Sequence, residues 1–165
     1  MLRIGICDDS AEARQHMLQL CQKYYENNTD AFEYKMYKNA EEVLEYCDDE
    51  ENQKIDILFL DIEMDGLSGI KLKERVLKLD KIWRIAFVSS HDEKMIESFG
   101  IKTIDFIRKP AGYMDVKAVL EKVLREKCEN VGISYLSETG QNIIIYAEYI
   151  RYIEAQGKYA YIYTN

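Results

Sequence analysis

The stretch "IDILFLDIEMDGLSG" (residues 55–69) decides the fold of this chain. Its apolar run from Ile57 to Leu60 is typical of a strand that is buried on both faces, as the strands of parallel sheets are. The run ends on Asp61, and further acids and glycines follow at once. We therefore predict a central strand that carries a carboxylate to one edge of a parallel sheet.

On either side of this strand, short apolar runs alternate with amphipathic helical patterns, which is the signature of an α/β sheet. Asn39 with Glu42 forms a capping-box pattern, and Ser68 is the predicted N-cap of the helix after the central strand. The first five predicted strands are residues 2–7, 31–37, 55–60, 84–90 and 103–107. The predicted helices are 11–27, 39–47, a segment after residue 68, a short one ending at residue 100, and one over the apolar stripe 116–124. Together they predict a doubly wound, five-stranded parallel sheet.

The sequence changes character near residue 127. Residues 131–165 hold seven of the 13 tyrosines and show no long helical pattern. "GISYL", "NIIIY", "EYIRYIEA" and "KYAYIYT" are predicted strands, with turns at 139–141 and 156–157. We predict a first domain at 1–126, a linker at 127–132 and a partial all-β segment at 133–165.

Composition limits the class of protein. The 165 residues are 47% hydrophobic and carry a formal net charge of −8, which argues against a nucleic-acid interface over the whole surface. The four cysteines are spread out, with no metal-site or disulfide spacing, so we expect buried, reduced thiols. Neither a leader pattern nor an apolar run of membrane-spanning length is present, and we expect a cytoplasmic protein.

Unusual polar residues stand at the ends of four predicted strands. Asp8 and Asp9 follow the first strand, Asp61 ends the third, and Ser89 and Lys109 end the fourth and fifth. Ligands of doubly wound sheets bind at this carboxyl edge. Three carboxylates in one cleft repel one another, and a hard divalent cation such as Mg²⁺ would relieve that repulsion. The set predicts phosphoryl transfer onto a carboxylate, with Asp61 as the nucleophile.

The motifs that carry these residues resemble a known family. In order, "CDD" (7–9), "LFLDIEMDGLSG" (58–69), "FVSS" (87–90) and "DFIRKP" (105–110) resemble the receiver domain of bacterial response regulators, which has a flavodoxin-like fold. The resemblance covers residues 1–126. It implies that Asp61 accepts a phosphoryl group from a sensor histidine kinase. Asp65, where many receivers have proline, and Ser89, where threonine is commoner, are mild departures.

The same resemblance assigns the remaining roles. Asp8 and Asp9, with Asp61 and the backbone carbonyl of Glu63, would hold Mg²⁺ or Mn²⁺. Ser89 and Lys109 would bind phosphoryl oxygens, and Phe106 would turn inward with Ser89 as a switch. A cis peptide bond is implied at Lys109–Pro110.

The tail "YIRYIEAQGKYAYIYT" (149–164) resembles the start of a LytTR-type DNA-binding domain. That resemblance implies a transcriptional regulator whose output domain is incomplete here, so we expect a fragment of a longer protein. DNA binding is expected of the full-length output domain and not of this fragment. Open strand edges predict pairing of the tail with a second copy, that is, a homodimer.

The leading hypothesis is thus a two-component response regulator that catalyses only its own phosphorylation and slow autodephosphorylation. One alternative is a receiver-fold scaffold that works without phosphorylation. Another is a Mg²⁺-dependent phosphatase, although Glu63 stands where such enzymes have a second aspartate. His91 is interpreted as the exposed start of a helix, and His16 as a surface residue of the first helix.

Overall fold

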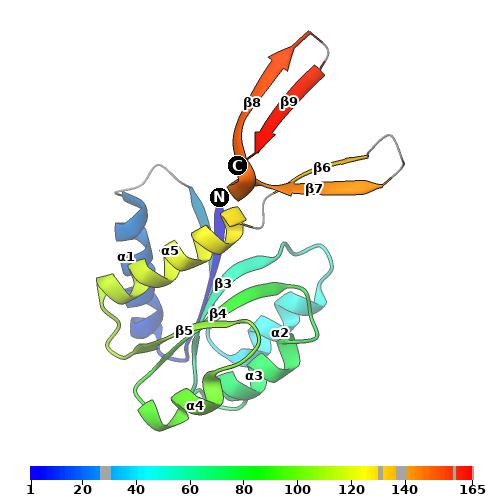
Figure 1. The fold of residues 1–165 in the computed structure, drawn as a ribbon. Helices are drawn as coiled ribbons and strands as arrows, with labels where there is room; N and C mark the ends of the chain where they lie inside the picture. Colours follow the sequence, from blue (N-terminus) through cyan, green and yellow to red (C-terminus); the bar gives the residue numbers. More distant parts are fainter. Residues whose placement is uncertain (27–30, 130–131, 137–140, 158, 165) are drawn as a thin grey trace. The chain divides into compact units, whose positions relative to one another are not determined.

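The computed structural model describes residues 1–26, 31–129, 132–136, 141–157 and 159–164. The chain divides into two compact units, Met1–Val123 and Leu124–Asn165, and each is described by itself. The first contains the predicted five-stranded parallel sheet, in the order β2-β1-β3-β4-β5 (Figure 1). Its strands are β1 (Leu2–Cys7), β2 (Phe32–Tyr37), β3 (Ile55–Asp61), β4 (Ile82–Ser89) and β5 (Thr103–Arg108).

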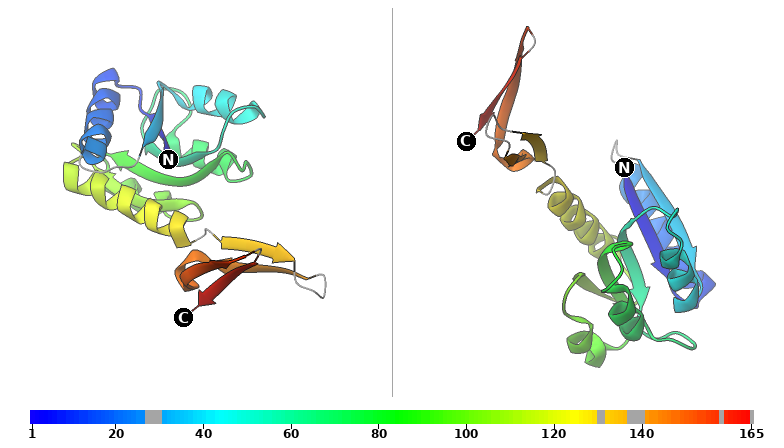
Figure 2. Two further views of the ribbon diagram at one scale, coloured as in Figure 1. Left: turned by 90° about the horizontal axis from the view of Figure 1, so that it is seen from above. Right: turned by 90° about the vertical axis from the view of Figure 1, so that its right-hand side faces the viewer.

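Helices cover both faces of this sheet, with α1 and α5 on one face and α2 and α3 on the other (Figures 1 and 2). The α-helices are α1 (Ala11–Glu26), α2 (Ala40–Asp48), α3 (Gly69–Val76), the short α4 (Met95–Ser98) and α5 (Tyr113–Glu129). A 3₁₀ turn, η1 (Asp92–Lys94), precedes α4. The prediction of a doubly wound α/β fold is confirmed.

The core explains why β3 stands at the centre. All seven residues of β3 are buried, because β1 and β4 flank it and helices cover both faces. Leu60, Leu72 and Val76 belong to one buried cluster that joins β3 to α3. On β2, the edge strand, only Tyr37 is buried, while Tyr34 and Met36 are exposed, so burial does not alternate along this strand.

Helix ends show both successes and failures of the sequence predictions. Asn39 caps α2 as predicted, since its Oδ1 accepts a hydrogen bond from the Glu42 amide at 3.0 Å. Ser68 occupies the predicted N-cap position of α3, but its side chain makes no capping hydrogen bond. The prediction is therefore right about the position and wrong about the hydrogen bond. The expectation of buried thiols holds for Cys7, Cys21 and Cys47, whereas Cys128 is exposed.

Two lysines cap helices from neighbouring elements. Lys73 of α3 is 6% exposed, and its Nζ donates to the carbonyl oxygens of Ser98 and Phe99 at the end of α4, both at 3.1 Å. Lys102, just before β5, donates to Val76 and Leu79 at the end of α3. Ammonium groups suit the negative end of a helix dipole, so each contact ties one helix end to the next element.

The second unit contains two antiparallel hairpins. One pairs β6 (Gly132–Leu136) with β7 (Asn142–Tyr146), and the other pairs β8 (Ile150–Gln156) with β9 (Tyr159–Thr164). A short 3₁₀ turn, η2 (Ala147–Tyr149), precedes β8. The predicted turn at 139–141 lies largely outside the described residues, whereas Gly157 has a φ of +63°, as a tight turn requires.

No helix in the described part of the chain is long and apolar enough to cross a membrane.

Candidate phosphoacceptor site

Three carboxylates meet at the carboxyl edge of the sheet. Asp8 and Asp9 follow β1, and Asp61 ends the neighbouring strand β3. One oxygen from each of the three lies within 4.8 Å of the others. Asp8 and Asp61 are buried, while Asp9 is exposed. The sheet order therefore brings together acids that lie more than fifty residues apart in the sequence.

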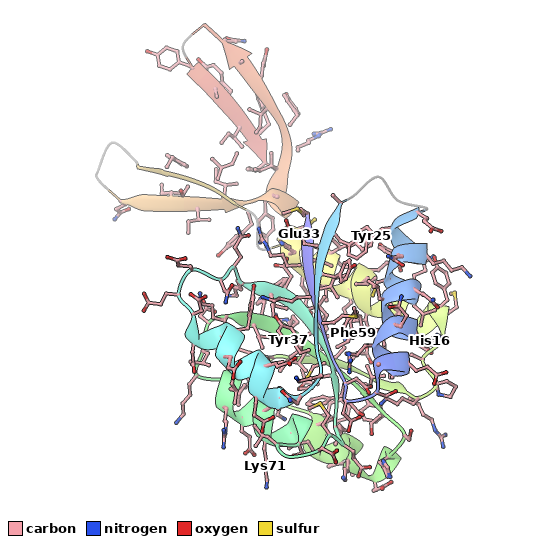
Figure 3. All side chains as sticks on the ribbon, turned by 180° about the vertical axis from the view of Figure 1, so that it is seen from behind. His16, Tyr25, Glu33, Tyr37, Phe59 and Lys71 are labelled. Atoms are coloured by element: carbon pink, nitrogen blue, oxygen red, sulfur yellow. The ribbon has the colours of Figure 1, made fainter. Side chains whose placement is uncertain are left out.

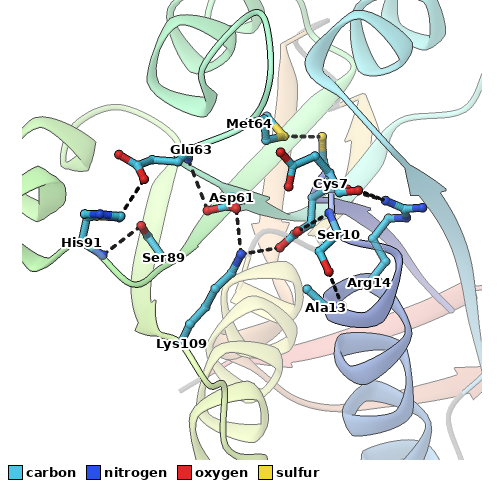
Figure 4. A network of polar contacts seen from close by, with 12 residues as sticks. Cys7, Ser10, Ala13, Arg14, Asp61, Glu63, Met64, Ser89, His91 and Lys109 are labelled. Atoms are coloured by element: carbon cyan, nitrogen blue, oxygen red, sulfur yellow. Dashed lines mark hydrogen bonds and ion pairs between the residues drawn. The ribbon is translucent and has the colours of Figure 1, made fainter.

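Lys109, which follows β5, connects two of these acids. Its Nζ lies 2.7 Å from Asp61 Oδ2 and 2.6 Å from Asp8 Oδ2 (Figure 4). The Lys109 amide donates to the Ser89 carbonyl at 2.9 Å, which fixes the lysine at the sheet edge, and the Lys109–Pro110 peptide bond is cis. A single ammonium group thus serves two carboxylates.

Burial and the charges of neighbouring groups shift the pKa of Asp61 and of Lys109 in opposite directions. Burial raises the pKa of Asp61 above its usual range, although the hydrogen bond and charge of Lys109 oppose that rise. For Lys109, burial lowers the pKa, but its hydrogen bonds to Asp61 and Asp8 outweigh burial and raise it. Lys109 is therefore charged at neutral pH, and its charge offsets part of the free-energy cost of burying an ionised Asp61.

Backbone and side-chain donors hold the acidic loops in place. The Ser10 amide donates to Asp8 Oδ1 at 2.9 Å, and the Glu63 amide lies 3.3 Å from Asp61 Oδ1. Arg14 Nη1 donates to the backbone carbonyls of Asp8 at 2.6 Å and Asp9 at 3.1 Å, as Figure 4 shows for part of the network. Sequence reasoning missed this role of Arg14. The available signal was an arginine one turn into the helix that follows the acidic pair.

A glycine allows the close contact between α3 and Asp61. A Cβ on Gly69 would lie 2.0 Å from the Asp61 carbonyl oxygen, so no other residue fits without movement. The Gly69 amide also donates to the Ile62 carbonyl at 3.0 Å. The start of α3 therefore packs directly against the backbone that presents Asp61.

Ser89 lies at the end of β4 and is 1% exposed. Its Oγ accepts a hydrogen bond from the His91 amide at 3.2 Å, and a hydroxyl group can donate as well as accept. Phe106 is partly buried against the core cluster of the α2–α3 face. Its predicted movement as a switch stays a prediction.

The loop after β3 and the segment after β4 are joined through Glu63. Its carboxylate contacts His91 Nδ1 at 2.9 Å and forms an ion pair with Lys94. The hydrogen bond from Lys94, helped by the charges of His91 and Lys94, lowers the pKa of Glu63, although burial opposes this shift. The sequence analysis gave Glu63 a role only through its backbone carbonyl and placed His91 at the exposed start of a helix, and it missed the contact between their side chains.

The donor set fits a hard divalent cation. Asp8, Asp9 and Asp61 offer only oxygen atoms, their ligand atoms are close enough to share one ion, and Mg²⁺ prefers one or two carboxylates completed by water and phosphate. The structure thus brings together Asp8, Asp9, Asp61 and Lys109, and it places Ser89 at the adjacent strand end.

Comparison with known proteins agrees with this geometry. Residues 4–121 match the family model for the response regulator receiver domain. Among solved structures, the response regulatory domain of mrkE from Klebsiella pneumoniae superposes with a TM-score of 0.64 at 24% identity, covering 76% of this chain and 97% of that domain. A CheY-like receiver domain from Methanospirillum hungatei has a TM-score of 0.61 at 21% identity, covering 77% of this chain and 97% of that one. These likenesses show the fold.

Curated relatives extend the comparison. The sensory transduction protein LytT of Bacillus subtilis is 27% identical over 142 residues, which are 86% of this chain and 56% of that protein. The accessory gene regulator protein A of Staphylococcus epidermidis is 33% identical over 112 residues, which are 66% of this chain and 46% of that protein. The chain spans about half the length of such relatives. With the family model matched over most of its length, and the acids and lysine of the sheet edge in contact, the chain belongs to the response regulator receiver family.

Proposed function

We propose that this chain is the signal-receiving part of a two-component transcriptional regulator, and that Asp61 accepts a phosphoryl group from a sensor histidine kinase. The observation that carries the proposal is the contact of Lys109 with both Asp61 and Asp8 beside a third carboxylate, Asp9. This arrangement offers a nucleophile, a fixed cation and oxygen ligands for a metal within one site.

The reaction follows from these positions. An Asp61 carboxylate oxygen attacks phosphorus, the bond between phosphorus and the donor breaks, and the donor leaves with the bonding electrons. Lys109 stands 2.7 Å from Asp61 and stabilises negative charge on the transferred group. Asp8 and Asp9, with Asp61 and the backbone carbonyl of Glu63, would hold Mg²⁺ or Mn²⁺, which supplies positive charge against the phosphoryl oxygens when bound. The chain performs this transfer on itself, and slow loss of the phosphoryl group would return it to its initial state.

Phosphorylation would act as a switch through Ser89. Its hydroxyl, next to the site, would donate to a phosphoryl oxygen, and Phe106 would follow by turning inward. The result would be a population shift of the surface near α4 and β5 that favours a homodimer. Ile96 and Phe99 of this surface are 83% and 55% exposed, which supports an interaction there.

The output of the whole protein is proposed from the second unit and the relatives. The hairpin β8–β9 carries the residues that resemble a LytTR-type DNA-binding domain. The match to LytT covers 142 residues, more than the 118 residues from 4 to 121, and so supports likeness beyond the receiver. DNA binding and transcriptional control would belong to the full-length protein.

Intact mass spectrometry tests the acceptor. The chain is incubated with Mg²⁺ and phosphoramidate, a small phosphodonor, beside the variant Asp61→Asn. We expect one added phosphoryl group on the parent and none on the variant. Equal addition to both would show another acceptor, and no addition to the parent with bound Mg²⁺ would contradict self-catalysed phosphorylation.

A further inference from the structure

β2 is the outermost strand on one side of the sheet, and among the described strands only β1 pairs with it. Just before β2, the Ala31 carbonyl accepts a hydrogen bond from the Leu2 amide at 3.2 Å. At its end, the Tyr37 carbonyl accepts one from the Asp8 amide at 3.3 Å. Backbone groups alternate in direction along a strand, so residues 31, 33, 35 and 37 turn theirs toward β1. Residues 32, 34 and 36 therefore direct their N–H and C=O groups outward, as a template for a further strand.

The face of β2 on the α2 side is charged. Glu33, labelled in Figure 3, and Lys35 are both exposed. Arg3 Nε lies 3.2 Å from Glu33 Oε2, and Lys35 Nζ lies 4.3 Å from the centre of the Tyr46 ring on α2. A negative and a positive side chain thus stand on either side of Tyr34 along the open edge of the sheet.

The opposite face of β2, on the α1 side, is apolar. Phe32 stacks on Tyr25 of α1 with ring centres 4.4 Å apart, and the Tyr34 ring lies 6.1 Å from that of Phe32. Met36 follows on the same face because side chains alternate along a strand. Tyr34 and Met36 are 48% and 39% exposed. Both side chains would lose contact with water if another strand lay beside β2.

We propose that β2 is an interaction surface for a second copy of this chain, through antiparallel pairing of the two β2 strands about a two-fold axis at Tyr34. In this register Glu33 faces Lys35 of the second copy, and the symmetry repeats that pair on the other side of the axis. Phe32 faces Met36, and the two Tyr34 residues face each other. The result is one sheet that continues from the first copy into the second.

Backbone geometry and charge both select this register. Phe32, Tyr34 and Met36 form the hydrogen-bonded pairs and would exchange about six backbone hydrogen bonds. Glu33 and Lys35 form the pairs between them, where opposed Cα atoms are about 4.5 Å apart and side chains meet most closely. The neighbouring registers that still match outward backbone groups have the axis at Glu33 or at Lys35. They would place two carboxylates or two ammonium groups opposite each other, which destabilises a strand pair.

The association would be weak and would need no phosphoryl group. A pair of single edge strands is small beside the roughly 1,600 Å² of a standard interface, so we expect a dimer at about 100 µM chain and above. The contact involves neither the proposed phosphoacceptor nor the surface near α4 and β5. It therefore adds a second way for receivers of this kind to associate, beside the proposed phosphorylation-dependent one.

Two charge reversals test the pairing, with sedimentation velocity of the whole chain as the readout and no phosphodonor present. Glu33→Lys and Lys35→Glu each place like charges opposite each other, so each alone should associate at least about tenfold more weakly than the parent. An equal mixture of the two variants should associate about as well as the parent, because every opposed pair is then again of opposite charge. Glu45→Lys is the matched control: Glu45 is exposed on α2 and off the edge, so this variant should behave as the parent.

The mixture makes the outcome specific, since the tail and the surface near α4 are the same in all these variants. Restored association in the mixture supports the antiparallel register at Tyr34. Single variants that associate as well as the parent would overturn the proposal. So would a mixture that associates as weakly as its components.

A cross-link tests the axis without a change of charge. In a Cys128→Ser background, which removes the exposed thiol, Tyr34→Cys should form a disulfide-linked dimer under mild oxidation. The Cα atoms of a hydrogen-bonded pair lie about 5.5 Å apart, within the range of a disulfide. Met36→Cys is the control on the same face, because in this register the two copies of residue 36 are about 14 Å apart along the strands and should not be linked. Equal cross-linking of both variants, or of neither, would overturn the register.

Discussion

Replacing Gly69 by alanine tests how tightly Asp61, the proposed phosphoacceptor, is held. The new Cβ would lie 2.0 Å from the Asp61 carbonyl oxygen and 3.1 Å from Leu60 Cγ. Ordinary contacts between carbon and a carbonyl oxygen are about 3.3–3.6 Å, so the start of α3 must move by more than about 1 Å. That movement strains the hydrogen bond from the Gly69 amide to the Ile62 carbonyl.

The expected loss of stability follows from three contributions. Overpacking of a buried site costs about 1–3 kcal/mol, and the weakened hydrogen bond costs about 1 kcal/mol more. The higher helix propensity of alanine returns about 1 kcal/mol. The clash is with a backbone carbonyl, which cannot rotate away as a side chain could. We therefore take the overpacking cost at the upper end of its range and expect a net loss of stability of about 3 kcal/mol.

Urea unfolding measures this loss as a lower midpoint at unchanged slope. The rate of phosphorylation of Asp61 should fall as well, since the displaced backbone carries the acceptor. Gly112→Ala is the control: there a Cβ meets side-chain atoms of Asp115 and no backbone, with Oδ2 at 3.0 Å, so even if the hydrogen bond from the Gly112 amide to Oδ2 weakens, a loss of no more than about 1 kcal/mol is expected. A Gly69→Ala variant as stable as the parent would refute the claim that α3 packs directly against the acceptor strand.

Three further predictions concern other parts of the chain. Lys73→Met removes the ammonium group that caps α4. The Thr103 amide donates to the Gly100 carbonyl in the adjacent turn, so its hydrogen exchange should become about tenfold faster. Unchanged exchange would contradict a role of Lys73 in holding that turn. A disulfide reagent at pH 8 should modify Cys128 and spare Cys47, because only thiolates react and burial raises the pKa of Cys47 to about 11. In urea all four thiols should react. Modification of Cys47 in the folded protein would count against its burial. Mg²⁺ at a hundred times its dissociation constant should stabilise the parent by about 2.7 kcal/mol in thermal unfolding and should stabilise Asp8→Asn much less, with equal stabilisation excluding Asp8 as a ligand.

The sheet could be predicted from sequence because its signals are local and repeated. Apolar runs such as Ile57–Leu60 admit few interpretations when amphipathic helices separate them, and parallel order then places their carboxyl ends on one edge. The convergence of Asp8, Asp61 and Lys109 followed from that topology without any knowledge of side-chain geometry.

The sequence predictions failed where the outcome depends on the conformation of a side chain or on its contact with a distant part of the chain. Lys73 lies in a polar helical pattern, yet its stem passes through the interior and its ammonium group reaches α4. Ser68 has the residue type of an N-cap, but the hydroxyl makes no capping bond, since residue type gives a preference and not a rotamer. The contact of Glu63 with His91 joins two loops whose separation is set by tertiary packing alone.

The position of Lys109 explains how a change of charge at Asp61 could move the segment between β4 and α4. Its ammonium group is divided between Asp8 and Asp61, so a phosphoryl group on Asp61 must alter both contacts. The Lys109 amide is bonded to the Ser89 carbonyl, and the Ser89 hydroxyl accepts from the His91 amide. His91 in turn contacts Glu63, whose own amide lies against Asp61. These contacts form a closed ring of hydrogen bonds and ion pairs that includes Asp61, the proposed acceptor. A shift of Lys109 or Ser89 therefore requires adjustment of the segment that leads into α4.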